Sequence, residues 1–185
     1  MNGSEKKGPQ MLYDEAVSKI KSGRKNIKEG HNDEAAEDFN EALRLLDEDR
    51  TLTNSDKACW FYYNRGLANL MLKNFEEAKS NFIQAINCKN NDVAVFFYTL
   101  SLANLELGHS REAIDKINAA IEILESGRNQ KENENQHPAD YYHARGVIYK
   151  LKGDYDAALD DLLKAKRMRK QDEKAAPEKE RVPSR

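Results

Sequence analysis

The sequence predicts an all-α fold in which helical hairpins stack as a right-handed solenoid of about eight helices. Three observations predict it. One spacing of small and apolar residues recurs four times, glycines stand where the two helices of a hairpin would meet, and no segment shows the alternating pattern of a β-strand. The chain has 185 residues, and 34% of them are charged, so the outer helix faces are expected to be solvated.

The recurrent spacing explains which residue types it uses. A small residue is followed after twelve positions by Ala, after sixteen by a bulky apolar residue, and after nineteen by a second Ala. The four sets are Gly23, Ala35, Phe39, Ala42; Gly66, Ala78, Phe82, Ala85; Ser101, Ala113, Ile117, Ala120; and Gly146, Ala158, Leu162, Ala165. Gly inside a helix costs about 1 kcal/mol relative to Ala. Close packing of the next helix offsets that cost, so each small residue is predicted to face its bulky partner.

The elements follow in order along the chain. We expect hairpins over residues 16–49, 59–92, 94–127 and 139–172 within a repeat domain of residues 12–170, between a flexible N-terminus (1–11) and a disordered charged tail (173–185). Gly30, Gly108 and Gly153 fall at the turns, where a left-handed residue ends a helix, and Lys73-Asn74 takes this place in the second hairpin. Pro138 suits the first turn of the last hairpin.

Two polar inserts separate the hairpins. Residues 47–55 lie between the first and second, and residues 126–138 lie between the third and fourth. Both are polar and lack apolar periodicity, so they are predicted to be either helix extensions or exposed loops. Long loops are more often functional or mobile than inert, which leaves a binding role open beside the simpler interpretation as surface elements.

The pattern is strongest in two places, Tyr62 to Ala78 and Tyr142 to Ala158. It resembles the tetratricopeptide repeat, a helical hairpin of about 34 residues. The third copy departs from that pattern with Ser101 and Ile117, and the first has Lys19 and Asn32 where the second has Tyr62 and Phe75. The resemblance implies a scaffold that binds other proteins.

No motif points to an enzyme or to a bound cofactor. Cys59 and Cys88 are the only cysteines, with no CxxC, and they are expected to be free thiols with a disulfide as the alternative. His31, His109, His137 and His143 are scattered and form no ligand set. Because phosphate loops, nucleophile motifs and metal-ligand spacings are all missing, we expect neither catalysis nor a metal site.

The chain contains no run of eighteen apolar residues and no apolar N-terminal segment. Neither a membrane span nor a secretory signal is therefore predicted. We expect a cytoplasmic location, with the nucleus as the alternative.

Binding is predicted on the concave face, which the first helix of each repeat would line. A second apolar stripe runs along these helices, and a helix that is apolar nearly all round is either buried or covered by a partner. The stripe comprises Trp60, Tyr63, Leu67 and Met71 in the second repeat, Val95, Tyr98, Leu102 and Leu105 in the third, and His143 and Val147 in the fourth. We expect a groove for a partner peptide or helix. The alternative is that Trp60 and Tyr63 pack on neighbouring helices or under the first insert.

Tetratricopeptide domains of chaperone cofactors suggest a narrower ligand, an acidic C-terminal peptide held by a clamp of Lys, Asn and Arg. Only Asn64 matches that clamp, since Ile20 and Arg24 stand at the first pair of positions, and Val95 and Thr99 at the last. Lys21, Arg24 and Lys28 are still expected to make the inner side of the first helix basic, which keeps an acidic peptide as an alternative. Single-stranded RNA is a further alternative that the apolar stripe disfavours.

The C-terminal end differs from the rest of the chain in its charge and in its uncovered apolar residues. Residues 164–185 carry nine Lys or Arg against four Asp or Glu. This end is expected either to aid solubility or to attract an acidic partner, RNA or a membrane surface. The sequence offers no further apolar helix to cover Leu159, Leu163 and Met168. Self-association through the last helix is therefore a further hypothesis, and with it a self-assembling structural role.

Overall fold

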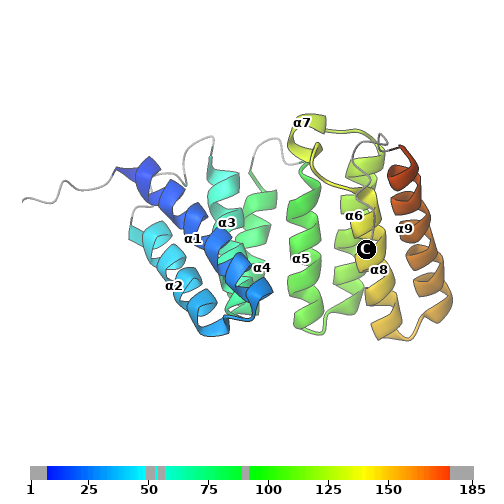
Figure 1. Cartoon of the computed structure of the whole chain (residues 1–185), viewed down its shortest axis with the longest axis horizontal. Helices are drawn as coiled ribbons and strands as arrows, with labels where there is room; N and C mark the ends of the chain where they lie inside the picture. Colours follow the sequence, from blue (N-terminus) through cyan, green and yellow to red (C-terminus); the bar gives the residue numbers. More distant parts are fainter. Residues whose placement is uncertain (1–7, 49–52, 54–56, 89–91, 176–185) are drawn as a thin grey trace, which may run out of the picture. The chain divides into compact units, whose positions relative to one another are not determined.

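A computed structural model describes residues 8–48, 53, 57–88 and 92–175. Within these residues there is no β-strand, which confirms the all-α prediction (Figure 1). The helices are α1 (Pro9–Glu29), α2 (Asn32–Glu48), α3 (Ala58–Met71), α4 (Phe75–Ile86), α5 (Ala94–Glu106), α6 (Ser110–Glu125), α7 (Gln130–Asn133), α8 (Pro138–Lys152) and α9 (Tyr155–Ala175). Eight of them are the long helices that the sequence predicts, and α7 is an additional short one.

The chain divides into two compact units. The N-terminal unit comprises residues 1–91 with 102–108, and the C-terminal unit comprises residues 92–101 with 109–185, so that α5 contributes to both. In the N-terminal unit α1 packs on α2, α2 on α3, and α3 on α4. In the C-terminal unit α6 packs on α8 and α8 on α9. Each unit is described by itself below.

The predicted ends of the repeat domain need correction. Helix α1 begins at Pro9, inside the segment 1–11 that the sequence predicts to be flexible, because a proline at the first helical position has its φ angle already set for a helix. Helix α9 continues to Ala175, so residues 173–175 of the expected tail are helical. The remainder of both segments, residues 1–7 and 176–185, lies outside the described residues, as does most of the first insert.

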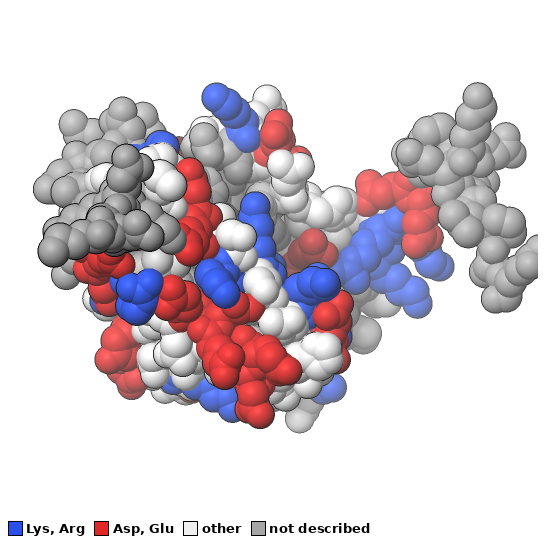
Figure 2. Space-filling model, turned by 60° about the vertical axis from the view of Figure 1, so that its left-hand side comes forward, with Lys and Arg blue, Asp and Glu red and all other residues white. Residues whose placement is uncertain are grey.

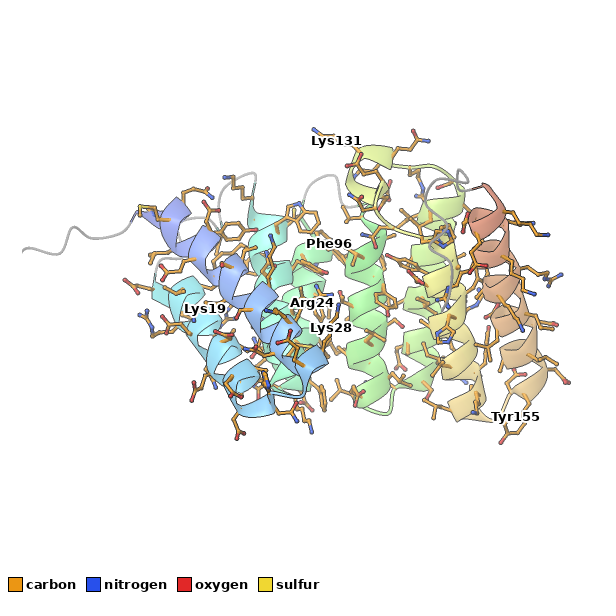
Figure 3. All side chains as sticks on the ribbon, in the orientation of Figure 1. Lys19, Arg24, Lys28, Phe96, Lys131 and Tyr155 are labelled. Atoms are coloured by element: carbon orange, nitrogen blue, oxygen red, sulfur yellow. The ribbon has the colours of Figure 1, made fainter. Side chains whose placement is uncertain are left out.

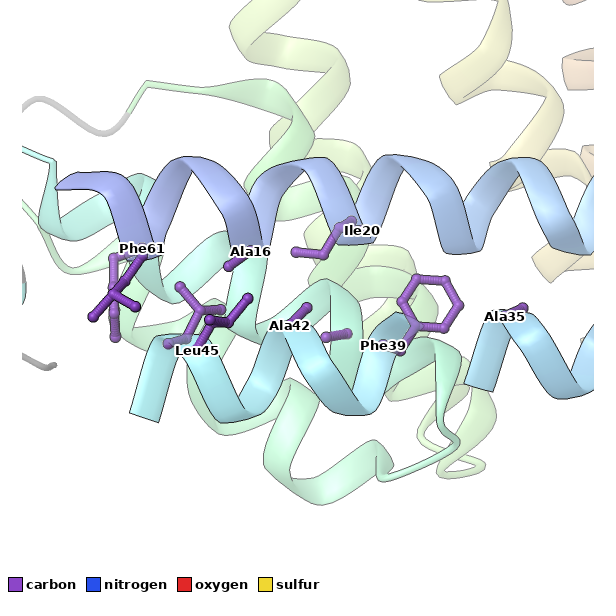
Figure 4. Packing of buried hydrophobic residues seen from close by; sticks show 10 residues of the cluster. Ala16, Ile20, Ala35, Phe39, Ala42, Leu45 and Phe61 are labelled. Carbon is purple, nitrogen blue, oxygen red and sulfur yellow. The ribbon is translucent and has the colours of Figure 1, made fainter. Parts of the chain in front are cut away.

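The core of the N-terminal unit lies between α1, α2 and α3. Its buried side chains alternate small and large residues along facing helices, which lets the helices interdigitate (Figure 4). The cluster comprises Leu12, Ala16, Ile20, Ala35, Phe39, Ala42, Leu45, Leu46, Phe61 and Ala68. Both Ala positions of the first repeat belong to it, as their i, i+7 spacing predicts.

The predicted pairing of small and bulky residues is confirmed in three repeats. A Cβ atom built on Gly23 would lie 2.9 Å from the Phe39 ring, and one built on Gly66 would lie 2.6 Å from the Phe82 ring. At Gly146 it would lie 3.0 Å from Leu162 Cγ. Each glycine thus lets the ring or branched side chain of the second helix rest directly on the backbone of the first.

Replacing Gly66 by Ala is expected to destabilise the N-terminal unit by about 1–2 kcal/mol. The gain of about 1 kcal/mol in helix propensity is outweighed by the clash of the new methyl group with the buried Phe82 ring. Urea unfolding followed by Trp60 fluorescence measures the change. In a Gly66→Ala/Phe82→Leu double variant the clash is relieved, so Gly66→Ala should cost less there. Equal cost in both backgrounds would contradict this packing.

The third repeat places a hydroxyl group where the others have glycine. Ser101 is fully buried, and its Oγ atom has no hydrogen-bond partner among the described residues. A buried polar atom without a partner costs about 1–3 kcal/mol. Ser101→Ala is therefore expected to stabilise the protein by about 1 kcal/mol, measured as a higher urea midpoint at an unchanged m-value. A loss of stability would show that the hydroxyl is bonded.

The turns inside the hairpins form as predicted. Gly30, Gly108 and Gly153 have φ angles of 84°, 78° and 85°, in the left-handed region that glycine adopts readily. In the second hairpin Lys73 occupies the same region at φ 63°. Pro138 begins α8.

The insert between the third and fourth repeats is partly buried. Asn133, the last residue of α7, is 7% exposed and accepts a hydrogen bond of 2.9 Å from the backbone amide of Ala94, the first residue of α5. Its amide nitrogen donates to the backbone oxygens of Asp92 and Arg128 at 2.8 and 3.0 Å. The insert therefore caps the N-terminus of α5. The sequence had suggested only a helix extension or an exposed loop, with a binding role left open.

A polar network joins α1 to α2. Asp38 is 8% exposed and accepts hydrogen bonds from Lys19 Nζ at 2.8 Å and from Asn26 Nδ2 at 3.1 Å. Burial alone would raise the pKa of Asp38. The hydrogen bonds from Lys19, Ser22 and Asn26 outweigh it and hold the pKa below its ordinary value.

This network makes stability depend on pH. Because the native pKa of Asp38 is depressed, its contribution is complete above the unfolded-state pKa of about 4 and is lost as the pH falls through the native pKa. Asp38→Asn should therefore be less stable than wild type at pH 7, and the difference should shrink below about pH 4. Urea unfolding across pH measures it. Glu37→Gln, at the exposed neighbouring position, is the control, and a pH-independent difference for Asp38→Asn would contradict the assignment.

Candidate partner-binding surface

A pocket of about 480 Å³ opens between α1 and α3 in the N-terminal unit. Helix α1 contributes residues at i, i+4 and i+8, which form one face, and α3 contributes residues from its first two turns. The lining residues are Tyr13, Asp14, Val17, Ser18, Lys21, Trp60, Tyr63 and Asn64. Four of them, Lys21, Trp60, Tyr63 and Asn64, are among the site residues that the sequence predicts.

The aromatic side of the pocket is ordered by packing within the unit. The rings of Trp60 and Tyr63 meet edge to face with centroids 5.4 Å apart, and the Tyr63 ring lies 6.1 Å from that of buried Phe82. Trp60 and Tyr63 are themselves half-buried. Each therefore packs on its own hairpin and also lines the pocket. That a partner binds there stays a prediction.

Asn64 serves the structure of the pocket floor. It is 8% exposed, and its amide nitrogen donates to Tyr13 Oη at 3.0 Å and to the backbone oxygen of Trp60 at 2.9 Å. Both amide hydrogens are thus engaged. Burial raises the pKa of Tyr13 despite the hydrogen bond from Asn64, so this phenol stays protonated at neutral pH. Asn64 cannot act as the free donor that a carboxylate clamp requires.

Charges of both signs border the pocket. Asp14 and Lys21 line it, and Arg24 lies further along α1 and is exposed. Figure 3 shows Lys19 on the side of α1 toward α2, whereas Arg24 and Lys28 project from the other side. Figure 2 shows Lys and Arg side chains interspersed with Asp and Glu rather than gathered in one field on the face drawn. Acidic and basic side chains therefore both lie beside the apolar wall of the pocket.

Three other predicted residues of this unit lie outside the pocket lining. Leu67 and Met71 are half-buried and pack against the hydrophobic cluster of α1, α2 and α3. Leu102 is half-buried on α5. The lower turns of the predicted stripe on α3 thus contribute to the core.

The predicted residues of the C-terminal unit differ in exposure. Tyr98 is half-buried with its ring centroid 5.0 Å from that of Tyr141, and burial together with the charge of Asp140 raises the pKa of Tyr98. Thr99 is buried, and its hydroxyl donates to the backbone oxygens of Val95 and Phe96, so it is not part of the exposed surface.

Val95 on α5 is half-buried, whereas His143 and Val147 on α8 are exposed. Residues 94–101 of α5 and the whole of α8 belong to the same unit. Tyr98 and Val95 therefore resemble Trp60 and Tyr63 in keeping part of each side chain accessible.

A second pocket, of about 590 Å³, lies between α6 and α8 and was not predicted. The charged groups Arg145, Glu122 and Glu125 of this pocket are already paired. Arg145 donates to Asp161 and to Asn118, and its guanidinium lies over the Tyr142 ring, 5.2 Å from the centroid. Lys164 Nζ lies 3.8 Å from the same centroid. We interpret this network as a structural joint between α6, α8 and α9.

Of the α1 residues that line the first pocket, the sequence interpretation found Lys21 and missed Tyr13, Asp14, Val17 and Ser18. Tyr13, Val17 and Lys21 recur at intervals of four residues, a signal that places them on one helix face. Beginning the first repeat at residue 16 excluded Tyr13 and Asp14 from consideration. Helix α1 in fact starts seven residues earlier and presents both.

An apolar stripe is exposed on α9. Tyr155, Leu159 and Leu163 are 69%, 56% and 45% exposed and recur every four residues, whereas Met168 is half-buried. Leu151, at the end of α8, is 67% exposed. Among the described residues, none of the helices is long and apolar enough to span a membrane, and no group of three His, Cys, Asp or Glu side chains could hold a metal ion.

Comparison with known proteins defines the fold and the family. The sequence model of the tetratricopeptide repeat matches residues 61–92 and 139–172, two of the four predicted hairpins. No curated protein sequence matches the chain. The hairpins described above and this match define an all-α helical-repeat fold of the solenoid class. The chain is a tetratricopeptide-repeat protein.

Solved structures share the fold. A structure of BtubC (BKLC) from P. vanneervenii has a TM-score of 0.64 at 22% identity, over 98% of this chain and 72% of that one. A structure of MamA has a TM-score of 0.54 at 24% identity, over 86% and 81% of the two chains. A structure of MamA from Desulfovibrio magneticus RS-1, covering residue 41 to the end, has a TM-score of 0.56 at 15% identity, over 86% of this chain and 98% of that one. Proteins of this repeat family are scaffolds for protein–protein interaction.

Proposed function

We propose that this chain is a non-enzymatic adaptor that binds a peptide or helix of a partner protein on the first helices of its repeats, with the pocket between α1 and α3 as the principal site. The observation that carries the proposal is the pocket itself, in which half-buried Trp60 and Tyr63 stand beside Val17 and exposed Lys21. Aromatic side chains held in place by packing are the residue types that contribute most to protein–protein binding.

The chemistry of the pocket favours one kind of segment. Its apolar wall accepts a large aliphatic or aromatic side chain, and Asp14 and Lys21 offer one charge of each sign for polar groups that flank it. A helix that presents such a side chain every three or four residues meets both requirements. The expected ligand is thus an amphipathic segment.

Selection from a random peptide library displayed on phage tests the proposal. Peptides enriched on the wild-type protein should contain a large apolar residue, and their affinity should fall at least about tenfold for Trp60→Ala and for Tyr63→Ala. Ile83→Ala is the matched control, because Ile83 is an apolar residue of the same hairpin, 39% exposed on α4, outside the pocket. Circular dichroism checks that each variant is folded. Equal affinity for all four proteins would refute the site.

Two basic residues of α1, Lys21 and Arg24, favour an acidic peptide as a variant of the same function. Lys21 and Arg24 are exposed, and neither takes part in an ion pair among those found in the described residues. A peptide with a C-terminal run of acidic residues should then lose affinity on Arg24→Glu and with rising salt. The complete chaperone-type clamp is not expected, because Asn64 is engaged. A labelled single-stranded RNA oligonucleotide is the third probe, and tight RNA binding would favour the alternative class.

The exposed stripe on α9 supports a second proposal, that the chain self-associates through this helix. Tyr155, Leu159 and Leu163 form one apolar face, and Asp156 and Lys166 lie near its two ends. Two α9 helices packed antiparallel would place Leu159 of each copy near Leu163 of the other, with Asp156 of one copy near Lys166 of the other. Such a two-fold interface is self-complementary.

Sedimentation equilibrium of the full chain tests the self-association. A dimer should form with a Kd in the micromolar range and should be lost in Leu159→Glu/Leu163→Glu, whereas Leu151→Glu, on α8, serves as the control. A monomer throughout the high micromolar range would exclude this role without affecting the pocket between α1 and α3.

A further inference from the structure

The two cysteines of the chain are brought together at one end of the second hairpin. Cys59 is the second residue of α3, and Cys88 follows the end of α4 by two residues. They are separated by 28 residues in the sequence. Both carry thiols rather than a disulfide, and both are half-buried.

The register of the hairpin places them opposite each other. Gly66 faces Phe82, and Arg65 Nη1 donates to Asn81 Oδ1 at 3.1 Å. Because α3 and α4 run antiparallel, each step toward the start of α3 matches a step toward the end of α4. Counting from these two contacts sets Cys59 opposite residues 87 to 89.

Side-chain contacts agree with that register. The Cys88 thiol donates to the backbone oxygen of Gln84 at 3.3 Å, as a residue continuing the path of α4 would, and it also lies within hydrogen-bonding reach of the Cys59 thiol. Burial, together with the neighbouring Cys59, raises the pKa of Cys88 to about 12. Cys88 is therefore a thiol at neutral pH and a poor nucleophile.

We propose that Cys59 and Cys88 form a reversible intramolecular disulfide, with glutathione disulfide as the oxidant. The thiolate of Cys59 attacks one sulfur of glutathione disulfide, which breaks the glutathione S–S bond, releases one glutathione thiolate and leaves glutathione bound to Cys59. Cys88 then loses its proton to solvent and attacks the Cys59 sulfur. A second glutathione leaves, the cysteine pair is oxidised by two electrons, and one glutathione disulfide is reduced to two glutathione molecules.

The disulfide would link the two helices of the second hairpin close to the pocket. A Cys59–Cys88 bond closes the open end of the α3–α4 hairpin, opposite the turn at Lys73. It is formed next to Trp60, which lines the pocket. The inference itself depends only on the hairpin and holds whether or not the pocket binds a peptide.

The test uses the reduced full chain in glutathione buffers of increasing oxidation, followed by acid quenching, alkylation of free thiols and mass spectrometry. Wild type should lose two hydrogens per chain and resist alkylation, and peptide mapping should join the peptides that carry Cys59 and Cys88. The effective concentration of one cysteine thiol relative to the other in the same chain follows from the glutathione ratio at which half of the chains are oxidised. It should fall at least about tenfold when the chain is unfolded in urea. Dithiothreitol should restore two alkylatable thiols.

Single variants separate the steps. Cys88→Ser should stop as a glutathione adduct on Cys59, and Cys59→Ser should react much more slowly than Cys88→Ser. The wild-type measurement stands even if a variant fails to fold. A stable glutathione adduct on wild type, a disulfide between two chains, or two free thiols at every buffer ratio would each overturn the proposal.

Discussion

Replacing Phe82 by Ala is expected to lower the free energy of unfolding by about 3–5 kcal/mol. Phe82 is fully buried in α4, and its ring rests on Gly66 of α3 and lies near Tyr63. Deleting the ring removes apolar contacts and leaves a cavity in a closely packed core. Urea unfolding followed by Trp60 fluorescence measures the loss in this unit.

The neighbouring Ile83 provides the control for this prediction. It is 39% exposed on the same helix, so Ile83→Ala should cost less than about 1 kcal/mol. The contrast between adjacent positions separates packing from helix propensity. A Phe82→Ala variant as stable as Ile83→Ala would show that the ring is not part of the core.

Replacing Asp161 by Ala should cost about 2–3 kcal/mol in the C-terminal unit. Asp161 accepts two hydrogen bonds from Arg145, at 2.7 Å from Nε and 2.8 Å from Nη2, and so joins α9 to α8. The side chains of Asp161 and Arg145 are 8% and 21% exposed. Removing the carboxylate leaves a largely buried guanidinium without its main acceptor, and that penalty exceeds the value of the pair itself.

Asp160→Ala is the matched control for Asp161, because Asp160 is exposed on the same helix. It should change stability by less than about 0.5 kcal/mol. In an Arg145→Met background, Asp161→Ala should cost markedly less, since no charge is then left unpaired. Urea unfolding followed by circular dichroism gives the free energy of unfolding of wild type, the two single variants at Asp161 and Arg145, and the double variant. If the effects of the two single variants simply add in the double variant, the proposed coupling is wrong.

The fold was predictable because its determinants are local. Gly23, Gly66 and Gly146 each indicate a close helix contact, and the bulky residue sixteen positions later supplies the partner. Gly30, Gly108 and Gly153 mark turns through the φ angles that only glycine adopts without strain. Such short-range rules depend on residues that the same hairpin contains.

Other features depend on contacts between distant residues and were missed. The cap that Asn133 places on α5 joins positions 39 residues apart, within a polar insert that has no periodicity. The Asp38 network depends on side-chain rotamers on α1. In the candidate site Trp60 and Tyr63 were found from their stripe, whereas Leu67 and Met71 of the same stripe turned out to face the core.

The most direct measurement of the proposed adaptor function uses Trp60, the single tryptophan of the chain. A peptide selected on the wild-type protein is titrated while the emission of Trp60 is recorded, and its Kd is measured independently by calorimetry. The emission should shift to shorter wavelength as the ligand covers the half-buried indole, and it should saturate with the calorimetric Kd. Binding by calorimetry with an unchanged Trp60 emission would place the ligand elsewhere and contradict the proposed pocket.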